Sequence, residues 1–169
     1  MQFSIQNSYG ILFDGAWLWE EYINILLSSH FYHPKNKSKF GAQQLFSDGK
    51  GLIYSDFISK SIDPRLIVDA KYKPIENIRG RDYLQVLAYM YRFDASQGYY
   101  IYPDSEGQVP LVLNLNKGST YENNVSTRDD VNIIKLGFKI PNKSANYNDF
   151  KMQIHESELV LQNFINSQI

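Results

Sequence analysis

The spacing of hydrophobic residues predicts three helices along the chain. Residues 16–29, "AWLWEEYINILLSS", carry an apolar stripe at helical spacing, and Asp14 precedes the stripe as a candidate N-cap. Residues 81–93, "RDYLQVLAYMYRF", are apolar on nearly every side, which predicts a helix packed on a sheet. A third helix is predicted for residues 156–167, "ESELVLQNFINS".

Shorter apolar runs between these helices predict strands over residues 52–60, 66–73, 98–103, 109–115 and 131–141. The segment "SIDPR" between the first two runs has the Asp-Pro chemistry of a turn, so those strands are expected to form a hairpin. The polar residues 34–51 and 116–130 are expected to be mainly loops. This order of elements predicts one α/β domain over residues 1–169, with a mixed central sheet flanked by helices.

The second arm of the predicted hairpin, "LIVDAKYK" (66–73), ends its apolar run with a carboxylate and an ammonium. Side chains alternate along a strand, so Asp69 and Lys71 lie on the same face. Residues of these types are rarely buried unless they are paired or bind a metal. The alternative is a strand that simply reaches solvent and becomes polar.

Composition narrows the class of protein. The chain has 169 residues, of which 43% are hydrophobic and 15% aromatic, enough for a folded domain with its own core. It has no cysteine, which excludes a disulfide scaffold and a thiolate metal site and suits a reducing cytoplasm. No apolar stretch reaches the roughly 18 residues of a membrane span. Without a GxxxxGK[ST] loop, the chain is not expected to hydrolyse nucleotides.

Positive charge is concentrated in the middle of the chain. Residues 35–92 carry eleven Lys or Arg and six Asp or Glu, a net charge of +5, whereas residues 1–34 and 93–169 each carry −3. A basic face of this kind can hold a phosphate backbone, and the alternative is a chance excess on a solvated surface. Within this segment, Lys73, Arg79 and Arg81 are candidate contacts to DNA.

Carboxylates from separate elements are candidates for one metal site. Glu20 lies at the border of the apolar stripe of the first helix, and Asp56 lies on the first arm of the hairpin. With Asp69 and the backbone carbonyl of Ala70, they are candidate ligands of Mg²⁺ (or Mn²⁺), which prefers oxygen. Such a cation polarises a phosphodiester and lowers the pKa of a bound water, which Lys71 would orient or deprotonate.

Gln85, on the second predicted helix, completes the pattern E…D…DxK…Q that is typical of PD-(D/E)xK nucleases. The chain resembles the nuclease subunit McrC of McrBC-type modification-dependent restriction systems, and its relatives in LlaJI-type systems. The resemblance covers about residues 12–115. It rests on "LWEEYI" (18–23), "YSDFI" (54–58), "LIVDAKYK" (66–73), "RDYLQVLAYMYRF" (81–93) and "YYIYP" (99–103).

The resemblance implies a restriction-endonuclease-like fold and a function. It implies a Mg²⁺-dependent endodeoxyribonuclease, the cutting subunit of a restriction complex of the 5-methylcytosine type used in phage defence. The expected partners are double-stranded DNA and an McrB-like AAA+ GTPase motor. The family pattern places its catalytic residues at Glu20, Asp56, Asp69, Lys71 and Gln85, and its proline before the first acid is replaced here by a serine. The domain expected is the catalytic one, without the N-terminal partner-binding region of the family.

Two other functions are compatible with the same residues. One is a non-catalytic, nuclease-like module that binds or regulates a motor NTPase. The other is a repair or transposition nuclease of the same fold. His30 and His33, in "HFYH", have a spacing that a metal site could use, but no further His or Cys lies near them in the sequence. We therefore expect both histidines to be structural.

Overall fold

The computed structural model describes residues 14–34, 42–107, 109–118 and 125–169. Its helices are α1 (Gly15–Leu27), α2 (Arg81–Phe93) and α3 (Tyr147–Asn166), with one 3₁₀ turn, η2 (Ile75–Asn77). The strands of the main sheet are β1 (Phe31–Tyr32), β4 (Phe57–Ser59), β5 (Leu66–Ala70), β6 (Gln97–Asp104), β7 (Leu111–Asn116) and β8 (Thr127–Lys139). Two further strands, β2 (Gln43–Gln44) and β3 (Leu52–Ile53), pair only with each other.

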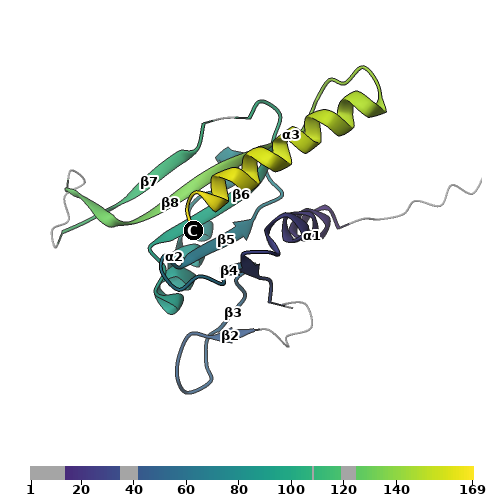
Figure 1. Cartoon of the computed structure of the whole chain (residues 1–169). Coiled ribbons are helices and arrows are strands. Elements are labelled where there is room, and N and C mark those ends of the chain that lie inside the picture. Colours follow the sequence, from purple (N-terminus) through teal and green to yellow (C-terminus); the bar gives the residue numbers. More distant parts are fainter. Residues whose placement is uncertain (1–13, 35–41, 108, 119–124) are drawn as a thin grey trace, which may run out of the picture.

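The centre of the molecule is a six-stranded mixed sheet in the order β1-β4-β5-β6-β8-β7 (Figure 1). Strands β5, β6 and β8 run parallel, while β1, β4 and β7 join them through antiparallel pairs. The predicted mixed sheet flanked by helices is therefore confirmed. Because β5, β6 and β8 are parallel, their carboxyl ends meet at the same edge of the sheet.

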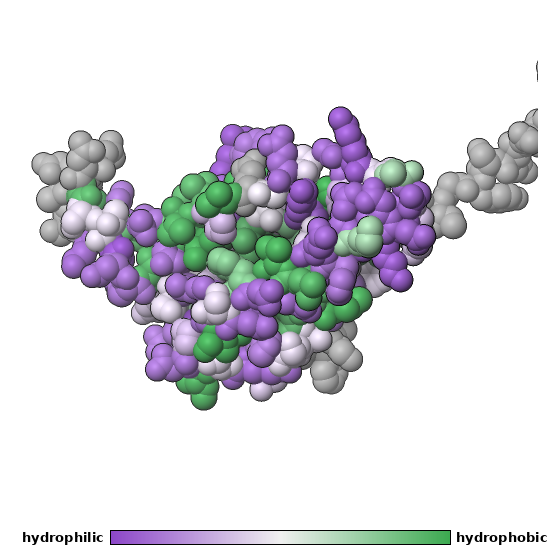
Figure 2. Space-filling model, turned by 45° about the horizontal axis from the view of Figure 1, so that its top comes forward, coloured by the Kyte–Doolittle hydropathy of each residue, from purple (hydrophilic) through white to green (hydrophobic). Residues whose placement is uncertain are grey.

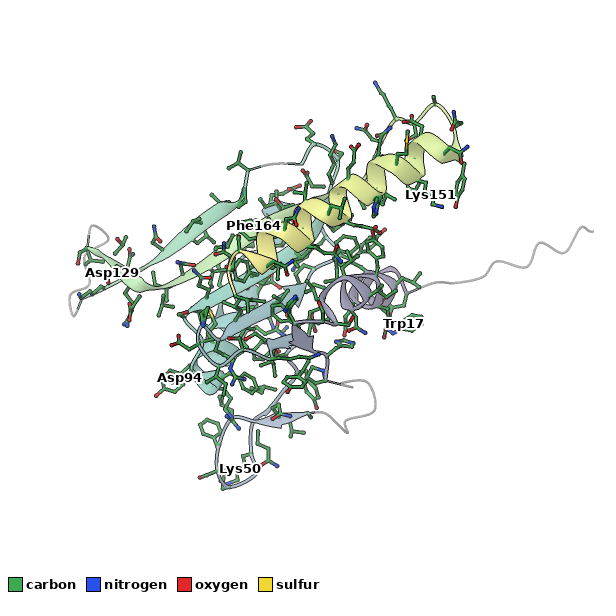
Figure 3. The ribbon with its side chains drawn as sticks, in the orientation of Figure 1. Trp17, Lys50, Asp94, Asp129, Lys151 and Phe164 are labelled. Carbon is green, nitrogen blue, oxygen red and sulfur yellow. The ribbon has the colours of Figure 1, made fainter. Side chains whose placement is uncertain are left out.

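Two apolar layers cover the two faces of the sheet. Helices α1 and α3 pack on one face of the sheet (Figure 3). There the rings of Phe164 on α3 and Tyr99 on β6 meet edge-on, with their centroids 6.1 Å apart. Helix α2 packs on the other face through its buried residues Val86, Tyr89 and Met90. The alternation along β5 follows this division, since Val68 faces the first layer and Ile67 the second.

The second helix has the predicted bounds, 81–93, but only one side of it is buried. The predicted packing of this helix on a sheet is confirmed, but Leu84 and Tyr91 on its outer side are 71% and 89% exposed. Its close approach to the sheet depends on Gly98, where an added Cβ would come within 2.6 Å of both Val86 and Met90. Helix α2 thus has more apolar residues than its one contact with the sheet can bury.

Three other predicted boundaries are wrong for local reasons. The run 52–60 is not one strand, because residues 54–56 leave the extended ladder between β3 and β4. Helix α3 begins at residue 147, nine residues before the predicted start, where the side chain of Asn146 accepts a hydrogen bond from the N–H of Asp149. Strand β8 likewise begins at residue 127, inside the segment predicted as a loop. Polar surface residues at the starts of α3 and β8 hide the true ends of these two elements from a search for apolar periodicity.

Among the described residues, no helix has both the length and the apolar character that a membrane crossing requires. Figure 2 shows hydrophobic side chains gathered in the middle of the visible face, with polar side chains towards its two ends. An apolar groove of about 440 Å³ runs between α3 and the end of β8, and its lining includes Phe138, Leu161 and Phe164. None of the predicted site residues lines this groove.

Candidate active site

Asp56 and Asp69 lie opposite each other across the antiparallel pair of β4 and β5. The register pairs Phe57 with Val68, so the next pair outward consists of the two aspartates. Residues directly opposite in such a pair share one face of the sheet, and here it is the face covered by α2. The sheet thus brings together two carboxylates that are thirteen positions apart in the sequence.

The peptide between Ala70 and Lys71 points its carbonyl to the same place. The N–H of Lys71 donates to the carbonyl of Ile101 on β6, at 2.9 Å. Because a trans peptide is planar, the carbonyl of Ala70 in that peptide points the opposite way, towards the β4 side. The N–H of Ala70 also points there and donates to Asp56 Oδ2 at 2.9 Å. The carbonyl of Ala70 therefore faces the carboxylate of Asp56.

The electrostatics of this pair favour a bound cation. Burial raises the pKa of Asp56 well above its ordinary value, and the negative charges of Asp69 and Glu20 raise it further. Burial also raises the pKa of Asp69, which is 1% exposed, although the charge of Lys71 opposes the rise. Two buried carboxylates that resist ionisation side by side are stabilised when a divalent cation neutralises both.

Lys71 is the nearest cation to these carboxylates. Its Nζ lies 2.6 Å from Asp69 Oδ2, and the lysine side chain is 18% exposed. At this distance the ammonium compensates the charge of a carboxylate that is almost fully buried. Burial by itself lowers the pKa of Lys71, but the neighbouring carboxylates, Asp69 foremost, together have a larger, opposite effect. The pKa of the lysine is therefore raised. Lys71 therefore keeps its proton at neutral pH.

Helix α2 holds Lys71 in place through two polar side chains. Nζ of Lys71 donates to Gln85 Oε1 at 3.4 Å, and Gln85 Nε2 donates in turn to the hydroxyl of Tyr89 at 2.6 Å. Asp82, one turn earlier, lies 3.8 Å from the same ammonium. The amide of Gln85 thus has a defined orientation, with its oxygen towards the lysine.

Glu20 reaches the same region from the other face of the sheet. It lies on α1, its side chain is 24% exposed, and its charge contributes to the raised pKa of Asp56. Glu21, by contrast, accepts a hydrogen bond from Trp17 Nε1 on its own helix at 3.1 Å. Figure 3 labels Trp17, which marks this solvent-facing first turn of α1. Of the two neighbouring acids, Glu20 is therefore the one beside Asp56.

The three basic residues predicted to contact DNA differ in their surroundings. Arg79 and Arg81 are exposed next to the start of α2. Lys73 instead donates two hydrogen bonds to Asp82, at 2.7 and 2.9 Å, so part of its charge is already neutralised. An open groove of about 740 Å³ lies at the carboxyl ends of the parallel strands, and Tyr72, Lys73 and Asp104 belong to its lining. Its first lining residue on the β5 side, Tyr72, directly follows Lys71 in the sequence.

The residues present fit a cation that prefers oxygen ligands, such as Mg²⁺ or Mn²⁺. No group of three or more His, Asp or Glu side chains in the described part of the chain is arranged to hold a metal ion. Mg²⁺, however, binds through one or two carboxylates and fills its remaining positions with water and substrate oxygens. Asp56, Asp69 and the carbonyl of Ala70 supply such a set of oxygen ligands.

Two side chains at this site were not singled out as site residues from the sequence. His33, expected to be only structural, lies against both Asp56 and Glu20. Asp82 holds Lys73 and approaches Lys71. Asp82 shares a stripe of α2 with Gln85 and Tyr89 that is visible in the sequence, but only Gln85 was predicted from it as a site residue. No local pattern indicates His33, because its position depends on the pairing of β1 with β4.

Comparison with models of protein families identifies a family for this chain. A family model described as McrBC 5-methylcytosine restriction system component matches residues 2–103. This region includes α1, the hairpin of β4 and β5, α2 and nearly all of β6, and therefore every residue of the candidate site. A search of curated proteins found no match.

Proposed function

Since this chain belongs to the family of McrBC 5-methylcytosine restriction system components, we propose that it is the DNA-cutting subunit of such a system. In this proposal it is a Mg²⁺-dependent endonuclease that hydrolyses phosphodiester bonds in double-stranded DNA. The observation that carries the proposal is the pair of Asp56 and Asp69, opposite each other at the sheet edge, with the ammonium of Lys71 in contact with the second. Two acids and a lysine at the end of a buried strand also support a PD-(D/E)xK fold.

Asp56, Asp69 and the carbonyl of Ala70 would hold the cation, with Glu20 beside them. When bound, Mg²⁺ supplies polarisation of the scissile phosphate and a lowered pKa for water. The protein contributes fixed oxygen ligands, because Asp56 Oδ2 is held by the N–H of Ala70. Preorganised ligands need no rearrangement when the substrate arrives.

Lys71 would act as a fixed positive charge in this mechanism. Its raised pKa keeps the ammonium protonated, so it can orient a water molecule and offset the negative charge that develops on the phosphate. It is a poor proton acceptor for the same reason, and we assign it no role as the general base. Gln85 keeps the lysine in position through its side-chain oxygen.

Arg79 and Arg81, exposed beside α2, would bind the DNA backbone near the site. A net charge of −1 gives the chain little general affinity for DNA. We therefore propose that efficient cutting requires the other subunits of the restriction complex, among them an NTPase motor. The expectation of a single catalytic domain over residues 1–169 remains part of this proposal.

The first test is metal binding, measured by isothermal titration of the whole chain with Mn²⁺. Asp56→Asn and Asp69→Asn should lose Mn²⁺ binding, whereas Lys71→Met should retain it because the lysine is not a ligand. Asp63→Asn is the matched control, since Asp63 is exposed in the turn before β5. Equal binding by wild type and the two aspartate variants would exclude the proposed site.

The second test is cleavage of 5-methylcytosine-containing plasmid by the chain together with its partner NTPase. Lys71→Met should lower the rate by about 100- to 1000-fold, the usual effect of removing one charge-stabilising group. A complex that binds Mn²⁺ but leaves DNA intact would favour the non-catalytic interaction module instead. Cutting that persists undiminished in Lys71→Met would contradict the role proposed for the lysine.

A further inference from the structure

His33 is held in a defined place by strand pairing and ring stacking. It follows β1, whose residues Phe31 and Tyr32 pair with Ser59 and Ile58 of β4. Continuing this register places His33 opposite Phe57, and the two rings stack with their centroids 4.8 Å apart and an angle of 26° between their planes. The histidine side chain is only 15% exposed. Its ring is therefore fixed before any partner or ligand binds.

Both nitrogens of this ring contact acids of the candidate site. Nδ1 lies 2.8 Å from the backbone carbonyl of Asp56. A carbonyl oxygen can only accept, so Nδ1 carries a proton and donates it. Nε2, on the other side of the ring, lies 3.7 Å from Glu20 Oε1. One side chain thus bridges an acid on a strand and an acid on a helix.

We propose that His33 is a positioning residue of the metal site, an inference that rests on the proposed function. The carboxylate of Asp56 is held by the N–H of Ala70, and its carbonyl is held by His33. Asp56 precedes the first residue of β4, so no ladder bond of β4 itself fixes it there. His33 restrains the backbone of Asp56 at this position, and its contact with Glu20 keeps that carboxylate near the same candidate metal site.

The alternative is a histidine that serves only to pack against Phe57. Three substitutions separate the two roles. His33→Phe keeps an aromatic ring but removes both polar contacts. His33→Asn places an amide N–H close to the position of Nδ1, and so should restore the bond to the carbonyl of Asp56. His30→Phe is the matched control, because His30 is exposed on the other side of β1.

The experiment is a titration of each purified variant with Mn²⁺, with the thermal midpoint of each metal-free variant measured alongside. We expect His33→Phe to bind Mn²⁺ about 10- to 100-fold more weakly, as is usual when a residue that orients a metal ligand is lost. His33→Asn should recover most of this affinity, and His30→Phe should match the wild type. Recovery in His33→Asn is what a packing role would not produce, since the amide cannot replace the ring.

The outcomes separate this inference from the proposed function. If the wild type binds Mn²⁺ and His33→Phe binds it equally well, the inference is overturned while the metal site stands. If His33→Phe and His33→Asn are weakened alike and melt at equally reduced temperatures, the ring acts by packing and the inference is again wrong. If the wild type itself binds no Mn²⁺, the proposed metal site is wrong, and so is the role inferred for His33.

Discussion

Replacing Lys71 by methionine tests whether the ion pair at the end of β5 contributes to the free energy of unfolding as much as a buried ion pair should. Methionine keeps most of the aliphatic stem and removes only the charge, so packing changes little. Asp69 is 1% exposed and would lose the ammonium that lies 2.6 Å from its Oδ2. Removing one partner of a buried ion pair costs about 3–5 kcal/mol.

The expected cost lies at the lower end of this range. Burial already raises the pKa of Asp69, so the isolated carboxylate can take up a proton instead of remaining charged. A loss of about 3 kcal/mol lowers the melting temperature of a domain of this size by about 6–12 °C. Lys73→Met is the matched control, because Lys73 and its partner Asp82 are 33% and 15% exposed. Because neither member of this pair is as buried as Asp69, its loss should cost less, towards the value of about 0–1 kcal/mol for an exposed pair.

The assay is thermal unfolding followed by circular dichroism, first in a chelator and then in Mg²⁺. In the chelator, Lys71→Met should melt well below both the wild type and Lys73→Met. In Mg²⁺ the gap to the wild type should narrow, because a bound cation replaces the missing positive charge and stabilises the folded state. If Lys71→Met melts together with Lys73→Met in the chelator, the argument from burial is wrong.

Three further predictions concern the acid pair and the packing around it. Asp56→Asn should stabilise the metal-free protein increasingly as pH rises above about 4, the ordinary range for Asp. The raised pKa of Asp56 makes the folded wild type hold more protons than the unfolded chain, so the stability of the wild type falls with rising pH. If urea unfolding gives the same stability difference between Asp56→Asn and wild type at pH 4 and at pH 8, this reasoning is contradicted. Gly98→Ala should lower the free energy of unfolding by about 1–3 kcal/mol, because the new methyl group meets Val86 and Met90. An unchanged free energy of unfolding in urea would show that α2 can move away from the sheet. Asn146→Ala should cost about 1 kcal/mol by removing the cap of α3, with a loss of helical signal at the start of that helix as the measurement.

Local patterns were sufficient for the elements that surround the site. The apolar run "RDYLQVLAYMYRF" predicted α2 at residues 81–93, and strand alternation alone put Asp69 and Lys71 on one face. The hairpin was predictable because its turn contains an Asp-Pro pair between two apolar runs. These features depend on neighbours a few residues apart, so a single sequence contains them.

Contacts between distant segments were decided only by the tertiary structure. Residues 54–56 leave the ladder because β3 pairs with β2 rather than with the main sheet, and this leaves Asp56 just ahead of β4, opposite Asp69. The place of His33 depends on the register of β1 against β4, which no local pattern specifies. Helical periodicity put Glu20 at the border of the apolar stripe, but only the packing of α1 on the sheet brings it close to Asp56. Periodicity determines which face a side chain occupies, whereas register and packing determine what it meets there.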